Sequence, residues 1–327
     1  MEIEIRTGLS PAEETLWLGF LKDRGLFPEE IPETVFFLWE NGALLGTASL
    51  SGDLIRHFAV DPAHRGEDLS ARLLTAIRSF AFERNVPRLY LLTKPENERV
   101  FRSLLFEPVA ETPSAVFMES PGGGLSELLS PFSSLPKGKN GAIVLNADPF
   151  TLGHRALIEK AAALCDAVFV FVLSEEKGRF SASDRLSMVK AGVADLPGVF
   201  VLPTGRYLVS AATFPTYFLK DKADGQKAAC ELDIAVFSQK IAPALGITVR
   251  FLGSEPFDPV TAQYNEALQK ELPKSGVSVS VIPRAEKDGK PISAKTVRAL
   301  LDQNDLPAAF SLLPESTAAY LKTLLSD

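Results

Sequence analysis

Asn146–His154, with the sequence NADPFTLGH, decides the fold of the second half of the chain. It follows the apolar run 142–145 and leads into the helical pattern 156–164, so it predicts a strand, a tight turn and the start of a helix. Thr151 and His154 are three residues apart at the expected helix N-terminus. Unpaired N–H groups and the positive end of the helix dipole favour a bound phosphate there. A hydroxyl and an imidazole at this place would suit the phosphates of a nucleotide.

The same stretch also has a simpler interpretation, because proline and glycine precede helices in many α/β proteins. A histidine in the first turn can act only as a helix cap. Short motifs match by chance often enough that this stretch alone leaves both interpretations open.

The composition is that of a globular protein of about two domains. The chain has 327 residues, of which 46% are hydrophobic, and one domain commonly takes ~100–200 residues. The net charge of −7 argues against a nucleic-acid binder, which usually has a basic face. The charged N-terminus lacks a signal-peptide core, and the apolar run 167–173 is too short to span a membrane. We therefore expect a cytoplasmic protein with no nucleic-acid or membrane partner.

A change of composition between Met118 and Asn140 predicts a linker between two domains. Residues 121–124 and 130–138 are rich in glycine, proline and serine, which suits a flexible connection. The expected boundaries are an N-terminal domain over 1–119, a linker over 120–139 and a C-terminal domain over 140–327.

The first half has the pattern of an α+β domain. Helices are expected over 13–24, 69–85 and 97–105, and strands over 35–40, 43–49, 54–60 and 89–93. The sequence AVDPAHRGEDLS at 59–70 resembles the loop, patterned Arg/Gln-x-x-Gly-x-Gly/Ala, that cradles the pyrophosphate of acetyl-CoA in GNAT N-acetyltransferases. Arg65 matches, but Asp68 and Ser70 replace the small residues. The Asp68 carboxylate would repel phosphate, so the resemblance implies a GNAT-like fold in which acetyl transfer is disfavoured.

The second half alternates short apolar strands with helices. Strands are expected over 142–145, 167–173, 199–202, 248–253 and 277–283, and helices over 156–164, 182–195, 230–245, 293–303 and 317–325. This alternation predicts an α/β domain with a doubly wound parallel sheet. In such sheets ligands bind at the carboxyl ends of strands, where the stretch 146–154 lies.

A second motif has the sequence ISAKTVR at 292–298. Ser293, 139 residues after His154, suits the N-cap of a helix, and Arg298 is within reach of a phosphate bound at that helix start. Taken alone, the motif is better explained by a plain serine cap and a solvated arginine.

The two motifs together resemble the signature of the HxGH nucleotidyltransferase superfamily. TLGH at 151–154 corresponds to the first motif, with Thr151 in the place of the first histidine, a known type of variation. The resemblance implies that His154, Ser293 and Arg298 position the α-phosphate of ATP and stabilise charge as pyrophosphate leaves. No covalent nucleophile is needed.

Longer strings narrow the resemblance to one family. They are TKPEN at 93–97, NADPFTLGH at 146–154, RFS at 179–181, DRL at 184–186, ATFPTYF at 212–218, GSEPF at 253–257, VTAQYN at 260–265 and the motif at 292–298. In these strings, and in the order of a GNAT-like half before a nucleotidyltransferase half, the chain resembles the citrate (pro-3S)-lyase ligases.

This resemblance implies an AMP-forming acid–thiol ligase. Acetate attacks the α-phosphate of ATP, giving acetyl-adenylate and pyrophosphate. The thiol of the CoA-derived prosthetic group on the citrate lyase acyl-carrier subunit then takes the acetyl group. Mg²⁺ is expected with ATP, held largely by phosphates and water. The sequence marks no metal site built by protein ligands alone, and Cys165 and Cys230 are too far apart in sequence to suggest one.

The implied site residues fall into two groups. The catalytic group is His154, Thr151 and Arg298, and the nucleotide-binding group is Asn146, Phe150, Gly153, Arg185, Gly253, Glu255, Ile292 and Ser293. Some have simpler alternatives: Arg185 also suits a surface ion pair with Asp184 or a neighbour, and 255–257 a simple βα turn. The aromatic run 214–218 suits a lid over the site or core packing equally well.

Three other functions are considered beside this one. An adenylyltransferase acting on a pantetheine-phosphate-like acceptor would share the site but would want further lysine or arginine side chains near it. A GNAT acetyltransferase using acetyl-CoA would work through the first half, which Asp68 and Ser70 disfavour. A non-catalytic nucleotide sensor is disfavoured because both phosphate motifs are intact.

Overall fold

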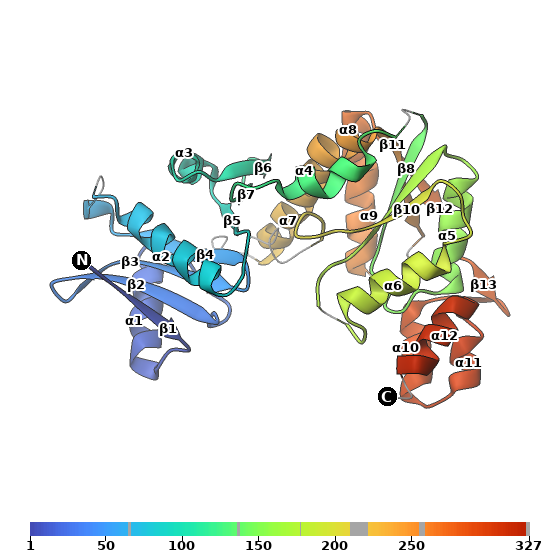
Figure 1. Ribbon diagram of the computed structural model, residues 1–327, viewed down its shortest axis with the longest axis horizontal. Helices are drawn as coiled ribbons and strands as arrows, with labels where there is room; N and C mark the ends of the chain where they lie inside the picture. Colours follow the sequence, from blue (N-terminus) through green and yellow to red (C-terminus); the bar gives the residue numbers. More distant parts are fainter. Residues whose placement is uncertain (65–66, 136–137, 177, 210–221, 255–258, 325–327) are drawn as a thin grey trace. The chain divides into compact units, whose positions relative to one another are not determined.

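The computed structural model describes residues 1–64, 67–135, 138–176, 178–209, 222–254 and 259–324. The chain divides into two compact units, Met1–Leu128 with Ala212–Ala235, and Leu129–Ala211 with Val236–Asp327. Each unit contains its own large sheet (Figure 1). Over the described residues, no helix is both long and apolar enough to cross a membrane. The segment 120–139 contains α4 (Gly124–Leu129) and a 3-10 turn at Ser130–Phe132.

The first unit is an α+β fold with a seven-stranded sheet in the order β1-β2-β3-β4-β5-β7-β6. Its strands are β1 (Glu2–Thr7), β2 (Thr34–Glu40), β3 (Ala43–Ser51), β4 (Leu54–Val60), β5 (Tyr90–Thr93), β6 (Glu107–Glu111) and β7 (Val116–Glu119), and its helices include α1 (Pro11–Lys22), α2 (Leu69–Glu83) and α3 (Glu98–Ser103). The neighbouring strands run antiparallel except β4 and β5, which are parallel.

Strand β2 shows why this sheet carries a helix on each face. Its side chains alternate between two faces, as in any strand. Phe36 and Leu38 join the apolar cluster that includes α2, whereas Val35 and Phe37 join the cluster that includes Trp17 of α1. This arrangement confirms the α+β fold that the sequence predicts for this half.

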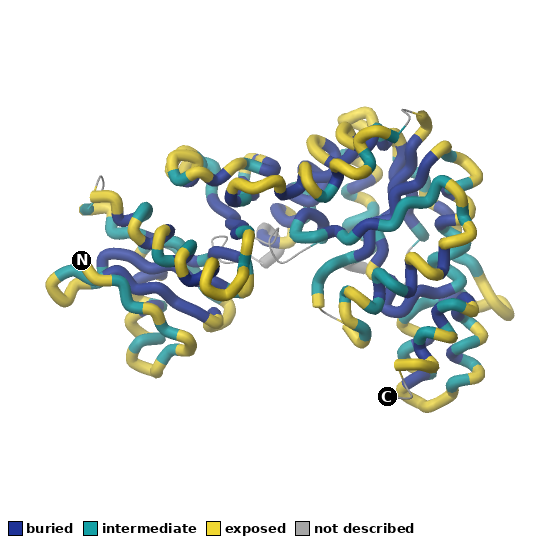
Figure 2. Tube along the Cα trace, viewed as in Figure 1, coloured by how far each residue is buried: buried dark blue, intermediate teal, exposed yellow. Residues whose placement is uncertain are grey.

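The second unit has a five-stranded sheet in the order β10-β9-β8-β11-β12, and all its neighbouring strands are parallel. Its strands are β8 (Asn140–Leu145), β9 (Ala167–Val172), β10 (Val199–Pro203), β11 (Ile247–Gly253) and β12 (Ser278–Ile282). The whole of β9 is buried, as expected for a parallel strand covered on both faces. Figure 2 shows that the strands β8 and β11 of the same sheet are also mostly buried. The predicted doubly wound parallel sheet is confirmed.

The strand order of this sheet has a switch point beside β8. The chain proceeds from β8 outward through α5 (Leu152–Ala162) to β9 and through α6 (Ala182–Gly192) to β10, and then returns to β11 on the other side of β8. The order therefore reverses between β8 and β11. In open α/β sheets ligands bind outside the carboxyl ends of the strands at such a switch point. The NADPFTLGH stretch begins at that end of β8.

The helix expected over 230–245 is interrupted. It forms α7 (Lys222–Val236), a π-helical turn at Phe237–Ile241 and α8 (Ala242–Leu245). Pro243 lies in α8, and because proline has no N–H it cannot continue the regular hydrogen-bond ladder. The change of helix type just before it has this physical cause.

The remaining helices of the second unit include two that the sequence pattern did not predict, α9 (Pro259–Glu271) and α11 (Leu306–Phe310). Helix α9 precedes β12, and α10 (Ala294–Asp302), α11 and α12 (Glu315–Leu324) follow a short β-hairpin. The hairpin strands are β13 (Glu286–Lys287) and β14 (Lys290–Pro291). Strands β1, β6 and β7 of the first unit were also not predicted, although the polar–apolar alternation EIEIRT of β1 is a strand pattern.

We predict that Gly192→Ala destabilises the second unit. A Cβ at this last residue of α6 would lie 2.6 Å from Cδ1 of Phe150, whose side chain is fully buried. Overpacking of this kind costs about 1–3 kcal/mol, which urea unfolding reports as a lower midpoint. Gly19→Ala in α1 is the matched control, because a Cβ there meets nothing within 4 Å. An unchanged midpoint for the Gly192 variant would contradict the packing.

Candidate functional site

The turn after β8 ends in a reciprocal helix cap. Thr151 is the N-cap of α5, and its Oγ1 accepts a hydrogen bond from the backbone N–H of His154 at 3.3 Å. In return, the backbone N–H of Thr151 donates to Nδ1 of His154 at 3.1 Å. Such a pair satisfies two of the N–H groups that a helix N-terminus leaves unpaired. The structure thus places Thr151 and His154 of the first motif in contact. His154 also caps the helix, as the simpler interpretation of the sequence expected.

The cap fixes the tautomer of His154. Because Nδ1 accepts a backbone N–H, it carries a lone pair, and the neutral imidazole holds its proton on Nε2. Burial lowers the pKa of His154 to about 4, and the positive charge of Arg284 adds to this shift. The ring also stacks on that of Phe150, at 5.8 Å between centroids and 12° between planes. His154 is therefore neutral at pH 7 and offers Nε2–H as a donor.

The two motifs, distant in sequence, touch each other. A Cβ on Gly153 would lie 2.9 Å from the carbonyl oxygen of Ile292, so only glycine allows this approach. Ile292 directly precedes Ser293, the N-cap of α10, whose Oγ accepts the backbone N–H of Thr296 at 3.0 Å. The N-termini of α5 and α10 therefore meet at the carboxyl edge of the sheet. Two helix N-termini together favour an anion more than one does.

Arg298 reaches back from α10 to the turn after β8. Its Nη1 donates to the backbone oxygen of Asp148 and lies 3.3 Å from the carboxylate Oδ2 of the same residue. The Arg298 side chain is one-third exposed, at 33%. Like the contact at Gly153, this pair places the second motif beside the first.

Arg185 is a buried residue that orients Asn146. Its Nη1 donates to the backbone oxygen of Asn146 at 3.1 Å and to Oδ1 at 2.5 Å, and its Nη2 donates to the backbone oxygen of Glu175. Burial of Arg185 excludes the surface ion pair with Asp184 considered from sequence. Because arginine only donates, Asn146 must turn its amide oxygen inward and its Nδ2 hydrogens outward. A direct phosphate contact from Arg185 stays a prediction.

The remaining predicted residues lie against His154, at the end of β11 or outside the described residues. Phe150 is fully buried, so its ring supports the His154 imidazole from below. Gly253 ends β11, and the next residue, Ser254, donates its N–H to the backbone of Ile282 at 3.0 Å. Glu255 lies outside the described residues, as do the aromatic residues 214–218.

Sequence reasoning missed Arg284, which follows β12 at the same edge of the sheet. Its backbone N–H donates to Oγ of Ser254 at 3.2 Å, and its Nε donates to the Ser254 backbone oxygen at 2.7 Å. The positive charge of Arg284 contributes to the lowered pKa of the His154 imidazole. A usable signal existed, because Arg284 stands directly after an expected strand, at its carboxyl end.

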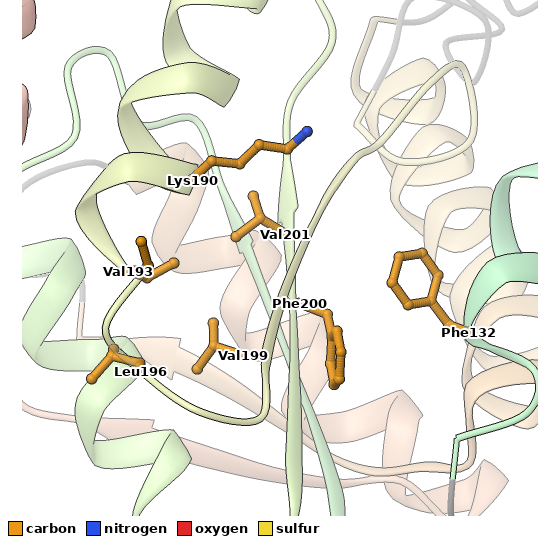
Figure 3. Close-up of a pocket in the computed structure, with 8 residues that line it drawn as sticks. Phe132, Lys190, Val193, Leu196, Val199, Phe200 and Val201 are labelled. Carbon is orange, nitrogen blue, oxygen red and sulfur yellow. The ribbon is translucent and has the colours of Figure 1, made fainter.

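Two other features of the described residues lie away from this edge. A hollow of about 310 Å³ is lined by Phe132, Lys190, Val193, Ala194, Leu196, Val199, Phe200 and Val201 (Figure 3). It lies against the first residues of β10, the opposite end from the carboxyl edge. Among the described His, Cys, Asp and Glu residues, one group could hold a metal ion, namely Glu40, His64 and Glu67 of the first unit.

The parallel sheet with paired helix N-termini at its switch point defines a nucleotidyltransferase-like domain. Residues 140–321 match the Citrate lyase ligase C-terminal domain, and residues 6–103 match the Acetyltransferase (GNAT) family. The citrate (pro-3S)-lyase ligase of Escherichia coli is 38% identical over 94% of this chain and 89% of its own, and that of Klebsiella pneumoniae 36% over 93% and 91%. The chain belongs to the citrate lyase ligase family, and is an enzyme of the ligase class.

A more distant likeness covers only the second half. The phosphopantetheine adenylyltransferase of Rhizorhabdus wittichii is 29% identical over 157 residues, which are 44% of this chain and 92% of its own. This similarity is consistent with a nucleotidyltransferase-like second unit.

We predict that His154 titrates with a pKa of about 4 and holds its proton on Nε2. Nitrogen-detected NMR of the imidazoles reports both quantities. Because the folded pKa lies below the unfolded value of about 6.5, the unfolded state binds more protons between these pH values. The contribution of His154 to stability is therefore full above pH 6.5 and is lost as the pH falls toward 4. A pKa near 6.5, or a proton on Nδ1, would contradict the cap.

Proposed function

We propose that this chain is an AMP-forming acid–thiol ligase that acetylates the prosthetic-group thiol of the citrate lyase acyl-carrier subunit. The observation that carries the proposal is the meeting of the two phosphate motifs at Gly153 and Ile292, in a chain related to citrate lyase ligases over more than nine-tenths of its length. The relatives are named citrate lyase ligases, which supports citrate lyase as the target. The site supports transfer of an adenylyl group.

The first step joins acetate to the α-phosphate of ATP. A carboxylate oxygen of acetate attacks phosphorus in line, the bond to the bridging oxygen breaks, and pyrophosphate carries away the electron pair. The N–H groups at the starts of α5 and α10, with Nε2–H of His154 and the guanidinium of Arg298, would stabilise the charge on the phosphates. Thr151 would act mainly by holding His154, and the outward Nδ2 of Asn146 would donate to the nucleotide or to acetate.

The second step moves the acetyl group to sulfur. The carrier thiol attacks the carbonyl carbon of acetyl-adenylate, the thioester bond forms, and AMP leaves with the oxygen that acetate brought. The thiol proton passes to solvent. No residue of the chain forms a covalent bond in either step.

Mg²⁺ would accompany ATP in this scheme. Among the described residues at the carboxyl edge, donors and cations predominate, and the carboxylates of Asp148 and Glu175 are already paired with Arg298 and Arg206. Such a set of side chains suits a Mg²⁺ ion held mainly by phosphate oxygens and water. The ion would help neutralise the triphosphate.

Of two alternatives, one keeps specific support and the other is disfavoured. The likeness to a phosphopantetheine adenylyltransferase favours a phosphate acceptor in place of acetate. An acetyl-CoA-dependent reaction in the first unit is disfavoured by Asp68, the N-cap of α2. Its φ of 55° is a glycine-like conformation, yet it places a carboxylate where the GNAT loop would hold pyrophosphate.

We expect ATP–pyrophosphate exchange to require acetate. Labelled pyrophosphate should enter ATP when ATP, Mg²⁺ and acetate are present, because the first step is reversible. Omission of acetate, or its replacement by phosphopantetheine, should abolish the exchange. Exchange supported by phosphopantetheine and not by acetate would establish the adenylyltransferase instead. Acetyl-CoA turnover without ATP would favour the acetyltransferase.

Replacement of His154 should separate its two roles. His154→Ala should lower exchange by about 10²–10³-fold, as loss of an oxyanion donor does. In His154→Asn the amide oxygen takes the place of Nδ1 and keeps the cap, but nothing replaces Nε2–H, so exchange should fall equally while the unfolding midpoint stays near that of the wild type. Full exchange by the asparagine variant would remove His154 from the chemistry.

A further inference from the structure

Asp148 is a buried carboxylate that binds three segments of the second unit. It is only 3% exposed. Its Oδ2 accepts the backbone N–H of Arg179 at 3.2 Å, and its Oδ1 accepts that of Phe180 at 3.0 Å. Its Oδ2 also pairs with Nη1 of Arg298 at 3.3 Å. The turn after β8, the loop before α6 and helix α10 are thus joined at one side chain.

The pairing uses only part of the Arg298 guanidinium. Both contacts to Asp148, with the carboxylate and with the backbone oxygen, are made by Nη1. Elsewhere in the described chain, nothing pairs with Nε or Nη2 of Arg298. Nε and Nη2 together form the edge of a guanidinium that binds a phosphate with two parallel hydrogen bonds. The side chain is held on one side and presents a matching donor pair on the other.

We propose that Asp148 is a positioning residue that fixes Arg298 so that Nε and Nη2 receive the phosphates of ATP. This inference deepens the proposed function and rests on ATP being the substrate of this site. It does not depend on whether the acceptor is acetate. A long arginine side chain has many rotamers, and ordering it costs conformational entropy. Because Asp148 holds Arg298 in one conformation before ATP binds, less entropy is lost when ATP binds.

The buried charge of Asp148 is compatible with a nearby triphosphate. Its two oxygens accept two backbone N–H groups and one guanidinium, so it is well compensated. Asparagine at this position has one oxygen and an NH₂ group, which would face a donor. Asp148→Asn should therefore remove the ion pair that fixes the Arg298 guanidinium, without changing the size of the side chain, and leave only the contact with the backbone oxygen.

The test is a double-mutant cycle on ATP affinity and on pyrophosphate exchange. The variants are Asp148→Asn, Arg298→Ala and the two combined. Calorimetric titration with Mg·ATP reports binding without turnover, so its result stands even if acetate is not the acceptor. We expect each single variant to weaken ATP binding about 10- to 100-fold, the scale of a hydrogen bond to a charged group. In the Arg298→Ala background, Asp148→Asn should add less than about 3-fold.

A matched control separates positioning from loop support. Asp302 pairs with Arg179 and so joins α10 to the same loop, but its contact does not involve Arg298. Asp302→Asn should leave ATP affinity unchanged. Equal losses from Asp148→Asn in both backgrounds, or tighter ATP binding by Asp148→Asn, would overturn the proposal.

A second variant keeps the test decisive if Asp148→Asn unfolds, which thermal unfolding would show. Arg298→Lys can retain the contact with Asp148 but has no second donor edge. It should keep the wild-type unfolding midpoint and lose ATP affinity as Arg298→Ala does. Wild-type ATP affinity in the lysine variant would contradict the proposal that Nε and Nη2 of Arg298 bind the phosphates.

Discussion

The close contact between Gly153 and the carbonyl of Ile292 is the constraint on which the site depends. A Cβ at position 153 would come within 2.9 Å of that oxygen, so a larger residue would push the starts of α5 and α10 apart. With glycine, two helix N-termini meet beside the switch point between β8 and β11. Their N–H groups supply a fixed positive potential, and the side chains around them determine where a bound phosphate group is stabilised.

The electrostatic design combines a neutral donor with fixed cations. His154 is neutral because its imidazole is partly buried and near Arg284, so its Nε2–H donates in the same way throughout the neutral pH range. Positive charge comes from arginine, whose ionisation does not change there. A chain with a net charge of −7 thereby concentrates cations and N–H donors at one edge of one sheet. Donors held in place before the substrate arrives need little reorganisation in the transition state.

Sequence patterns predicted the buried strands well, because continuous apolar runs leave few other structures, as in 167–173. They missed β1, although its residues alternate between polar and apolar, and they also missed the short strand β7 and the helices α9 and α11. At the site, Thr151 and His154 could be paired from their spacing alone. The partners of Arg298 and Asn146 could not, because they come from segments brought together only by the folded sheet.

The fate of the acetate oxygen tests the central claim most directly. With ¹⁸O-labelled acetate, ATP and the carrier subunit, attack on the α-phosphate followed by thiol attack on the carbonyl places one labelled oxygen in each AMP. Mass spectrometry of AMP measures this transfer, and we predict one ¹⁸O per AMP formed. Unlabelled AMP, or label in pyrophosphate or orthophosphate, would contradict an acetyl-adenylate formed at this site.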